Sequence, residues 1–409
     1  MALLSFSLKD NNIDIIQKEF LNNFEAGNYK FYYWGLNYGK FPDNIKNVHR
    51  FFSKLDGDLS GVLLFENQVY FYRSFPGITP LYYTFLNNKY YISDRFSNFP
   101  VLIKQNSEVL NRIKKLHKVN RKYTIYKNIR RFIPGGYVNI NNKKWKKISV
   151  LNNSEHCYKS LLTSSLKKRT DGIKKIAIFL SEGLDSGLLY EKALKINKEV
   201  ESFSIIFDSE SKKIIENRVG NNKSNNFDYQ SLKNEIKKTM FNSKDYIYSL
   251  NSLVFKNLLE KAKEKKFNRI ILGIGGDEIH GVDFIESLYK DFIIRLNLYR
   301  ILKHRKMILK IFKKPYLKLY KKSFLKYQIK NLFYSSYHMY ALEMIWMFFT
   351  EKDIYPVFPY LDKNIYNYVM NIPPQKILRI SKNRAKARKL SYDIYRKHSL
   401  KKSFENNRK

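Results

Sequence analysis

Cysteine and acidic side chains are scarce in this chain of 409 residues, and long apolar runs are missing from it. The single cysteine, Cys157, excludes a disulfide framework and a thiolate metal site. No run reaches the ~18 consecutive apolar residues that a membrane-spanning helix needs. The first residues also show no apolar stretch behind a basic one, so neither export nor a transmembrane segment is expected. We therefore expect a cytoplasmic protein.

The shortage of acidic residues leaves 76 basic against 36 acidic side chains and a formal charge of +40. Between Asp291 and Glu343 no acidic residue occurs, and Lys and Arg interleave with apolar residues over 295–330, which predicts amphipathic basic helices. Such a segment fits a membrane surface, nucleic acid or an acidic peptide. A compositional bias spread over the whole protein explains the charge equally well, since residues 143–147 carry the same excess. Nucleic-acid binding is therefore an alternative that we do not favour.

Residues 176–189 form the most informative stretch, because an apolar run breaks into a small-residue turn and resumes as a helix. The pattern predicts a strand, a loop and a helix that begins near Asp185. Ser181, Gly183 and Ser186 supply hydroxyl groups and a bare backbone, and the helix directs its unpaired N–H groups to the same place. These features predict an anion-binding loop.

A second buried strand over residues 269–272 ends in Gly273, Gly275 and Gly276, and then in Asp277 and Glu278. The carboxyl ends of parallel strands meet at one edge of a sheet, so Asp185 and Asp277 are expected to come together. Hard cations prefer carboxylate oxygens. The alternative is a pair of ordinary strand-to-helix turns in which the aspartates only cap helices.

The first loop resembles the Ser-Gly-Gly-x-Asp-Ser loop of the ATP-pyrophosphatase superfamily, and the second resembles the Gly-x-Gly-Gly-Asp-Glu-x-x-Gly motif of the asparagine synthetase family. Glu182 departs from the first pattern, because it takes the place of the first loop glycine. The resemblance implies ATP as the nucleotide and Mg²⁺ on Asp185 and Asp277. It implies catalytic roles for Asp277 and Glu278, and it assigns the nucleotide to the residues Ser181, Gly183, Asp185, Ser186, Gly273, Gly275 and Gly276.

Two later segments extend this resemblance. Residues 357–362 and the Ile-Pro-Pro of 372–374 are similar to the family's Val-Pro-Phe-Leu-Asp run and the Leu-Pro after it, although the family's preceding Glu-Ala-Arg is absent. An ordinary helix start with Asp362 near the N-cap is the alternative for this segment. In the basic stretch 382–389, Lys382 matches the family's lysine that neutralises pyrophosphate, and Arg384 is near enough to assist it.

The front of the chain alternates apolar strands and short polar turns over residues 55–94 and again near 133–138, which predicts an antiparallel layer. These segments resemble the glutaminase-type domain of asparagine synthetases. That domain uses an amino-terminal cysteine nucleophile, whereas this chain opens Met-Ala-Leu and its one cysteine, Cys157, lies far away. We therefore expect a degenerate αββα sandwich over 1–150, and a doubly wound parallel-sheet ATP-pyrophosphatase domain with added helices over 151–409. Glutamine is not expected to donate nitrogen.

Because it lacks the nucleophile, the chain resembles the β-lactam synthetase and lasso peptide cyclase branches of the family. The divergent spacing of its motifs looks most like that of the lasso peptide cyclases. That likeness implies adenylation of a side-chain carboxylate in a precursor peptide and closure of a macrolactam by the peptide's own amine. It also implies a leader-binding or peptidase partner protein. Two alternatives remain open: a synthetase for a small-molecule amide, and a non-catalytic relative that binds nucleic acid or serves as a scaffold.

Overall fold

The chain divides into two compact units. Unit 1 comprises Met1–Leu151, Tyr229–Ile270 and Tyr334–Pro356, and unit 2 comprises Asn152–Asp228, Ile271–Phe333 and Val357–Lys409. The division into domains at residue 150 stays a prediction. The computed structural model describes residues 3–7, 13–17, 21–100, 104–114, 121–148, 157–196, 199–228, 250–281, 323–334 and 336–378.

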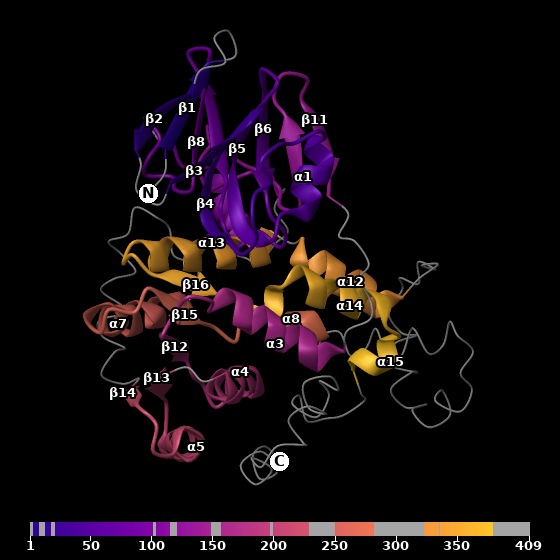
Figure 1. Ribbon diagram of the computed structural model, residues 1–409. Helices are drawn as coiled ribbons and strands as arrows, with labels where there is room; N and C mark the ends of the chain where they lie inside the picture. Colours follow the sequence, from indigo (N-terminus) through magenta and orange to yellow (C-terminus); the bar gives the residue numbers. More distant parts are fainter. Residues whose placement is uncertain are drawn as a thin grey trace, which may run out of the picture. The chain divides into compact units, whose positions relative to one another are not determined.

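Unit 1 contains two antiparallel sheets (Figure 1). The five-stranded sheet has the order β2-β1-β8-β7-β9, with strands Ile13–Gln17, Leu3–Ser7, Lys89–Ser93, Tyr82–Leu86 and Arg130–Arg131. The six-stranded sheet has the order β11-β10-β6-β5-β4-β3, with strands Lys144–Lys147, Gly136–Asn139, Gln68–Arg73, Gly57–Phe65, Tyr29–Asn37 and Asn22–Ala26. The predicted antiparallel layer is confirmed.

Strand β5 shows how the two sheets share a core. Leu59 and Leu63 pack with helix α1 (Val48–Lys54) in one aromatic-rich cluster, while Val62 faces the opposite way beside Phe71 of β6. The Phe71 ring lies 6.1 Å from that of Tyr83 on the five-stranded sheet, so the sheets pack face to face. Both faces of β5 are buried, because successive side chains of a strand point to opposite sides. This explains the continuous apolar run at residues 62–65 of the strand.

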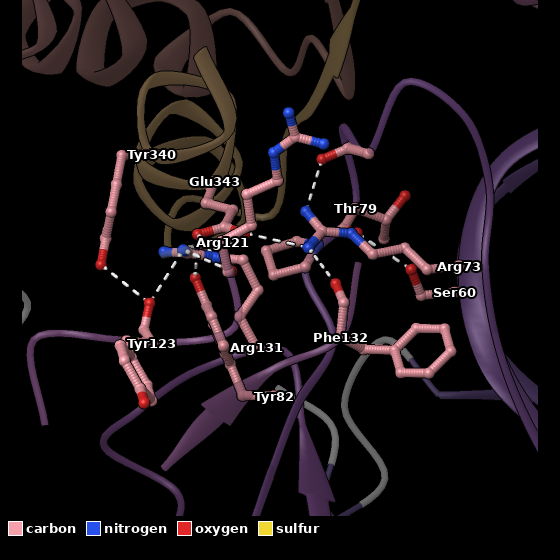
Figure 2. A network of polar contacts seen from close by, with 12 residues as sticks. Ser60, Arg73, Thr79, Tyr82, Arg121, Tyr123, Arg131, Phe132, Tyr340 and Glu343 are labelled. Carbon is pink, nitrogen blue, oxygen red and sulfur yellow. Dashed lines mark hydrogen bonds and ion pairs between the residues drawn. The ribbon is translucent and has the colours of Figure 1, made fainter. Parts of the chain in front are cut away.

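Besides α1, the described residues of unit 1 form the helices α2 (Ser107–Lys114), α7 (Leu250–Glu264) and α13 (Ser336–Thr350). Helix α13 carries Glu343, which is 1% exposed and lies among the side chains of Arg73, Arg131 and Tyr82 (Figure 2). Its carboxylate accepts from Arg131 Nε at 2.7 Å and from Tyr82 Oη at 2.7 Å, and lies 3.0 Å from Arg73 Nη1. Burial, and then the Glu343 charge, raise the pKa of Tyr82, so the hydroxyl stays protonated as a donor.

Unit 2 contains parallel strands that alternate with helices. Strands β12 (Lys175–Phe179), β13 (Glu199–Ile206) and β14 (Ser224–Asp228) pair in parallel, and they are joined by helices α4 (Leu184–Lys195) and α5 (Ser209–Val219). Parallel neighbours need such crossover helices, which cover the sheet and allow apolar strands. The mixed α/β class, with antiparallel sheets and a parallel sheet, is confirmed.

The described residues of unit 2 form further helices. They are α3 (Tyr158–Arg169), α8 (Gly276–His280), α12 (Phe324–Phe333), η2 (Pro359–Leu361), α14 (Lys363–Asn371) and α15 (Pro374–Ile377). Strands β15 (Arg269–Ile271) and β16 (Tyr355–Val357) lead into unit 2, where Leu272 N donates to Val357 O at 2.9 Å. Within the described residues, no helix is long and apolar enough to cross a membrane.

Candidate functional site

Two serines, one at the start of the loop between β12 and α4 and one in the first turn of α4, close this loop. Ser186 Oγ accepts from Ser181 N at 3.0 Å and lies 2.8 Å from Ser181 Oγ. Ser181 Oγ in turn accepts from Gly183 N at 3.2 Å. Gly183 is the N-cap of α4 with an extended backbone, so the helix starts directly after the loop. The positive end of the α4 dipole therefore faces this loop.

The second glycine motif lies directly against the first. A Cβ at Gly273 would be 2.9 Å from Ser186 N, and a Cβ at Gly276 would be 2.2 Å from Asp185 Cγ. Real Cβ atoms do not approach other atoms that closely, so only glycine allows this contact. The Asp185 carboxylate therefore lies against the backbone of Gly276, and Asp277 is the next residue along the chain. The two motifs therefore lie side by side, and the approach of the Asp185 and Asp277 side chains to each other stays a prediction.

The donor set of this site fits a magnesium–nucleotide complex better than a metal held by protein alone. Among the described residues, no group of three or more His, Cys, Asp and Glu is placed to hold a metal ion. Mg²⁺ commonly binds one or two carboxylates and takes its remaining ligands from substrate phosphates and water. Asp185, with its carboxylate against Gly276, and Asp277 next to that glycine can supply such a pair.

Glu278 and Gly275 shape the start of α8. Gly275 has φ = +97°, a left-handed conformation that glycine adopts without strain. Its N–H donates to Glu278 Oε2 at 3.0 Å, so the carboxylate caps its own helix. Tyr360 of η2 donates through its hydroxyl to Asp185 O at 3.0 Å and thereby supports the first turn of α4. A capping contact is thus seen at Glu278, and its predicted catalytic role stays a prediction.

Arg218 is a residue of this site that reasoning from the sequence missed. It lies in α5, is 6% exposed, and donates from Nη1 to Ser181 O at 2.6 Å and to Gly183 O at 3.0 Å. Its Nη2 donates to Glu182 O at 2.5 Å. One guanidinium group therefore holds three successive carbonyl groups of the loop. Nothing in the local sequence signals this role, because a lone arginine late in a polar helix is typical of a solvated face.

Asp362 belongs to a buried ion cluster between α3 and α14. Its Oδ2 lies 2.6 Å from Arg169 Nη1 and 2.6 Å from Lys168 Nζ, and its Oδ1 accepts from Asn364 N at 2.8 Å as the N-cap of α14. Burial alone would raise the pKa of Asp362, but the charges and hydrogen bonds of Arg169 and Lys168 lower it below the usual range. The sequence-based alternative, a helix N-cap, is confirmed for this aspartate.

Some predicted features lie outside the described residues. These are Lys382, Arg384 and the basic segment up to residue 322. Cys157 is exposed and occupies the N-cap of α3, where interactions with the backbone and the hydroxyl of Ser160 lower the pKa of the thiol. It lines a hollow of about 520 Å³ along α3 together with Ser160, Thr163 and Lys167, and no residue of the glycine loops lines that hollow.

Comparison with known proteins supports the assignment of the two glycine loops. The asparagine synthase family model matches residues 158–301, which include both loops and exclude Lys382. No curated protein sequence matches the chain. A solved structure titled "Structure of the allosteric regulatory enzyme of purine biosynthesis" is 11% identical, with a TM-score of 0.18 over 44% of this chain and 49% of that one. The match spans about half of that enzyme's length. The family match supports an ATP-dependent, amide-forming ligase.

Proposed function

We propose that this protein is an ATP-dependent ligase that activates a carboxylate as its adenylate, releases pyrophosphate, and joins the activated acyl group to an amine with release of AMP. The direct contact between the loop at 181–186 and the glycines at 273–276 carries the proposal. Backbone and hydroxyl groups suited to phosphate lie next to Asp185, and Asp277 follows Gly276 in the chain; folds of this kind bind ligands at the carboxyl ends of the parallel strands. The family match over 158–301 supports the same chemistry.

The proposal gives the residues of the site distinct roles. The backbone and serine hydroxyls of the loop bind the phosphates, and the α4 dipole favours their negative charge. Asp185 and Asp277 hold Mg²⁺, which neutralises phosphate charge when it is bound. Phe207, 57% exposed just beyond the end of β13, offers a ring surface for the adenine base. Lys382 is proposed to stabilise the departing pyrophosphate, with Arg384 beside it.

The finer proposal is that the acyl group and the amine belong to one precursor peptide, so that the product is a macrolactam. Holding the amine and the acyl adenylate together converts a bimolecular step into an internal one. A leader-binding or peptidase partner belongs to this proposal too. Its support is the resemblance of the sequence to enzymes that lack the glutaminase nucleophile.

The test is the nucleotide product. Purified protein is incubated with ATP, Mg²⁺ and candidate precursor peptides that carry an Asp or Glu side chain, and nucleotides and peptide masses are measured. AMP, pyrophosphate and a peptide lighter by one water are expected. ADP and phosphate as the products would contradict adenylation. AMP formation with a free amino acid and ammonia, and with no peptide, would retain the ligase and reject the macrolactam.

A further inference from the structure

Arg218 occupies a position that gives it more than a packing role. Its three hydrogen bonds reach the carbonyl groups of residues 181, 182 and 183, which are the turn of the proposed phosphate loop. A trans peptide is planar, so each carbonyl group and the N–H of the following residue point in opposite directions. With its carbonyl groups held by Arg218, the loop directs the N–H groups of Glu182 and Leu184 away from the guanidinium, and the Gly183 N–H donates to Ser181 Oγ within the loop.

The orientation of the loop's N–H groups matters for phosphate binding because Glu182 brings a carboxylate into the same loop. A carboxylate among donors meant for phosphate repels the ligand, and the repulsion between like charges grows as the surrounding dielectric falls. The Arg218 guanidinium brings a permanent positive charge to within hydrogen-bond distance of the Glu182 backbone. Gly187 leaves room for it, since a Cβ there would lie only 3.1 Å from Arg218 Cζ.

We propose that Arg218 is the positioning residue of the phosphate loop: it orients the loop's N–H groups toward ATP and offsets the charge of Glu182. The proposal rests on the ATP-dependent function proposed above. Arg218 itself lies behind the loop and is not a catalytic residue. It acts through residues 181–183, so its loss should weaken ATP binding more than it slows the chemical step.

The first experiment measures the loop without any nucleotide. Hydrogen–deuterium exchange of the peptide that covers residues 181–184 is compared between the parent protein, Arg218→Gln and Lys213→Gln. Lys213 is exposed on the same helix, so its variant removes one charge and no loop contact. Arg218→Gln should exchange at least ~10-fold faster in this peptide, and Lys213→Gln should match the parent. Unchanged exchange in Arg218→Gln would overturn the positioning role, whatever the protein does with ATP.

The second experiment measures Mg²⁺–ATP binding and turnover in the same variants. Arg218→Gln should raise the Kd and KM for ATP by about 10-fold or more and change kcat less. Arg218→Lys keeps the charge but loses the planar fork, so it should restore only part of the affinity. If the parent binds ATP and Arg218→Gln binds it equally well, the inference fails. If the parent binds no ATP at all, the proposed function fails, and exchange of the loop still decides the role of Arg218.

Two further variants separate charge from packing. Glu182→Gly should improve ATP affinity more in the Arg218→Gln background than in the parent, because Arg218 no longer offsets the carboxylate there. Equal gains in both backgrounds would reject the charge role. Gly187→Ala adds a Cβ 3.1 Å from Arg218 Cζ, so the guanidinium must shift by a few tenths of an ångström without any change of charge; alanine favours the helix, so the protein should stay folded and ATP binding should weaken less than in Arg218→Gln. Parent-like affinity in Gly187→Ala would contradict the need for accurate placement of Arg218.

Discussion

Glycine at positions 273 and 276 determines how closely the two loops of the candidate site approach. A side chain at either position would overlap the first turn of α4, at Ser186 or at Asp185. The sequence predicts this pair of loops because glycines, serines and aspartates mark both strand ends. The sequence does not predict the contact of Arg218 with the loop, because 35 to 37 residues separate them and only the fold brings them together.

Glu278 provides a test at the scale of one residue. Glu278→Gln keeps an oxygen that accepts from Gly275 N, so the cap and the thermal unfolding midpoint should be retained. Loss of the negative charge should lower AMP formation at least ~10-fold if the side chain takes part in catalysis, as the sequence predicts. Both quantities are measured on the same preparation. A variant with parent turnover would reduce Glu278 to a helix cap.

The elements of unit 2 follow from local sequence signals. The change from a buried apolar strand to a small-residue turn predicts a helix that begins near Asp185, and α4 begins at Leu184, after β12 has ended at Phe179. Asp362 as the cap of α14 follows from the same rules. The ion partners of Asp362 cannot be predicted from these rules, because Arg169 and Lys168 belong to helix α3, almost 200 residues earlier in the chain.

The cluster of Glu343 tests how α13 is fixed to the sheets of unit 1. Glu343→Gln leaves Arg73 and Arg131 buried without a compensating charge, so it should lower the free energy of unfolding by about 3–5 kcal/mol. Asp353→Asn is the matched control, because its ion pair with Lys263 is exposed and should contribute at most about 1 kcal/mol. Urea unfolding followed by circular dichroism measures both. Equal effects of the two substitutions would show that the buried cluster does not fix α13.

The cluster of Asp362 predicts how the stability of unit 2 depends on pH. Its pKa is lowered in the folded state, so the ionised carboxylate stabilises the fold above the unfolded value of about 3.9, and this contribution is lost as the pH falls through the folded pKa. Asp362→Asn should therefore be less stable than the parent at pH 7 by about 3–5 kcal/mol, with a gap that narrows below about pH 4. Chemical unfolding at pH 7, 4 and 3 measures this gap.

The control for Asp362 is Asp171→Asn, an exposed aspartate of the same unit, which should stay close to the parent at every pH. A gap between the parent and Asp362→Asn that widens as the pH falls, or that is absent at pH 7, would contradict the assigned ion cluster.

At the scale of the whole molecule, sequence reasoning predicts the class of the fold better than the long-range contacts. Alternation of apolar residues predicts the antiparallel strands, and an apolar run that breaks into a small-residue turn predicts β12 of the parallel sheet, whereas β14, with the sequence Ser-Asn-Asn-Phe-Asp, carries no such signal. Ion clusters such as Glu343 with Arg73 and Arg131 join segments more than 200 residues apart. The local sequence around each of these residues is typical of an ordinary surface charge, so only the fold shows that they form a buried cluster.

In the proposed function, ATP binds with Mg²⁺ where the two glycine loops meet. The decisive measurement is equilibrium binding of radiolabelled ATP, with and without Mg²⁺, to the parent, Asp185→Asn and Asp277→Asn. We expect Mg²⁺-dependent binding to the parent, and at least ~10-fold weaker binding to each variant with an unchanged circular dichroism spectrum. Variants that bind Mg²⁺–ATP as tightly as the parent, or a parent that binds none, would contradict it.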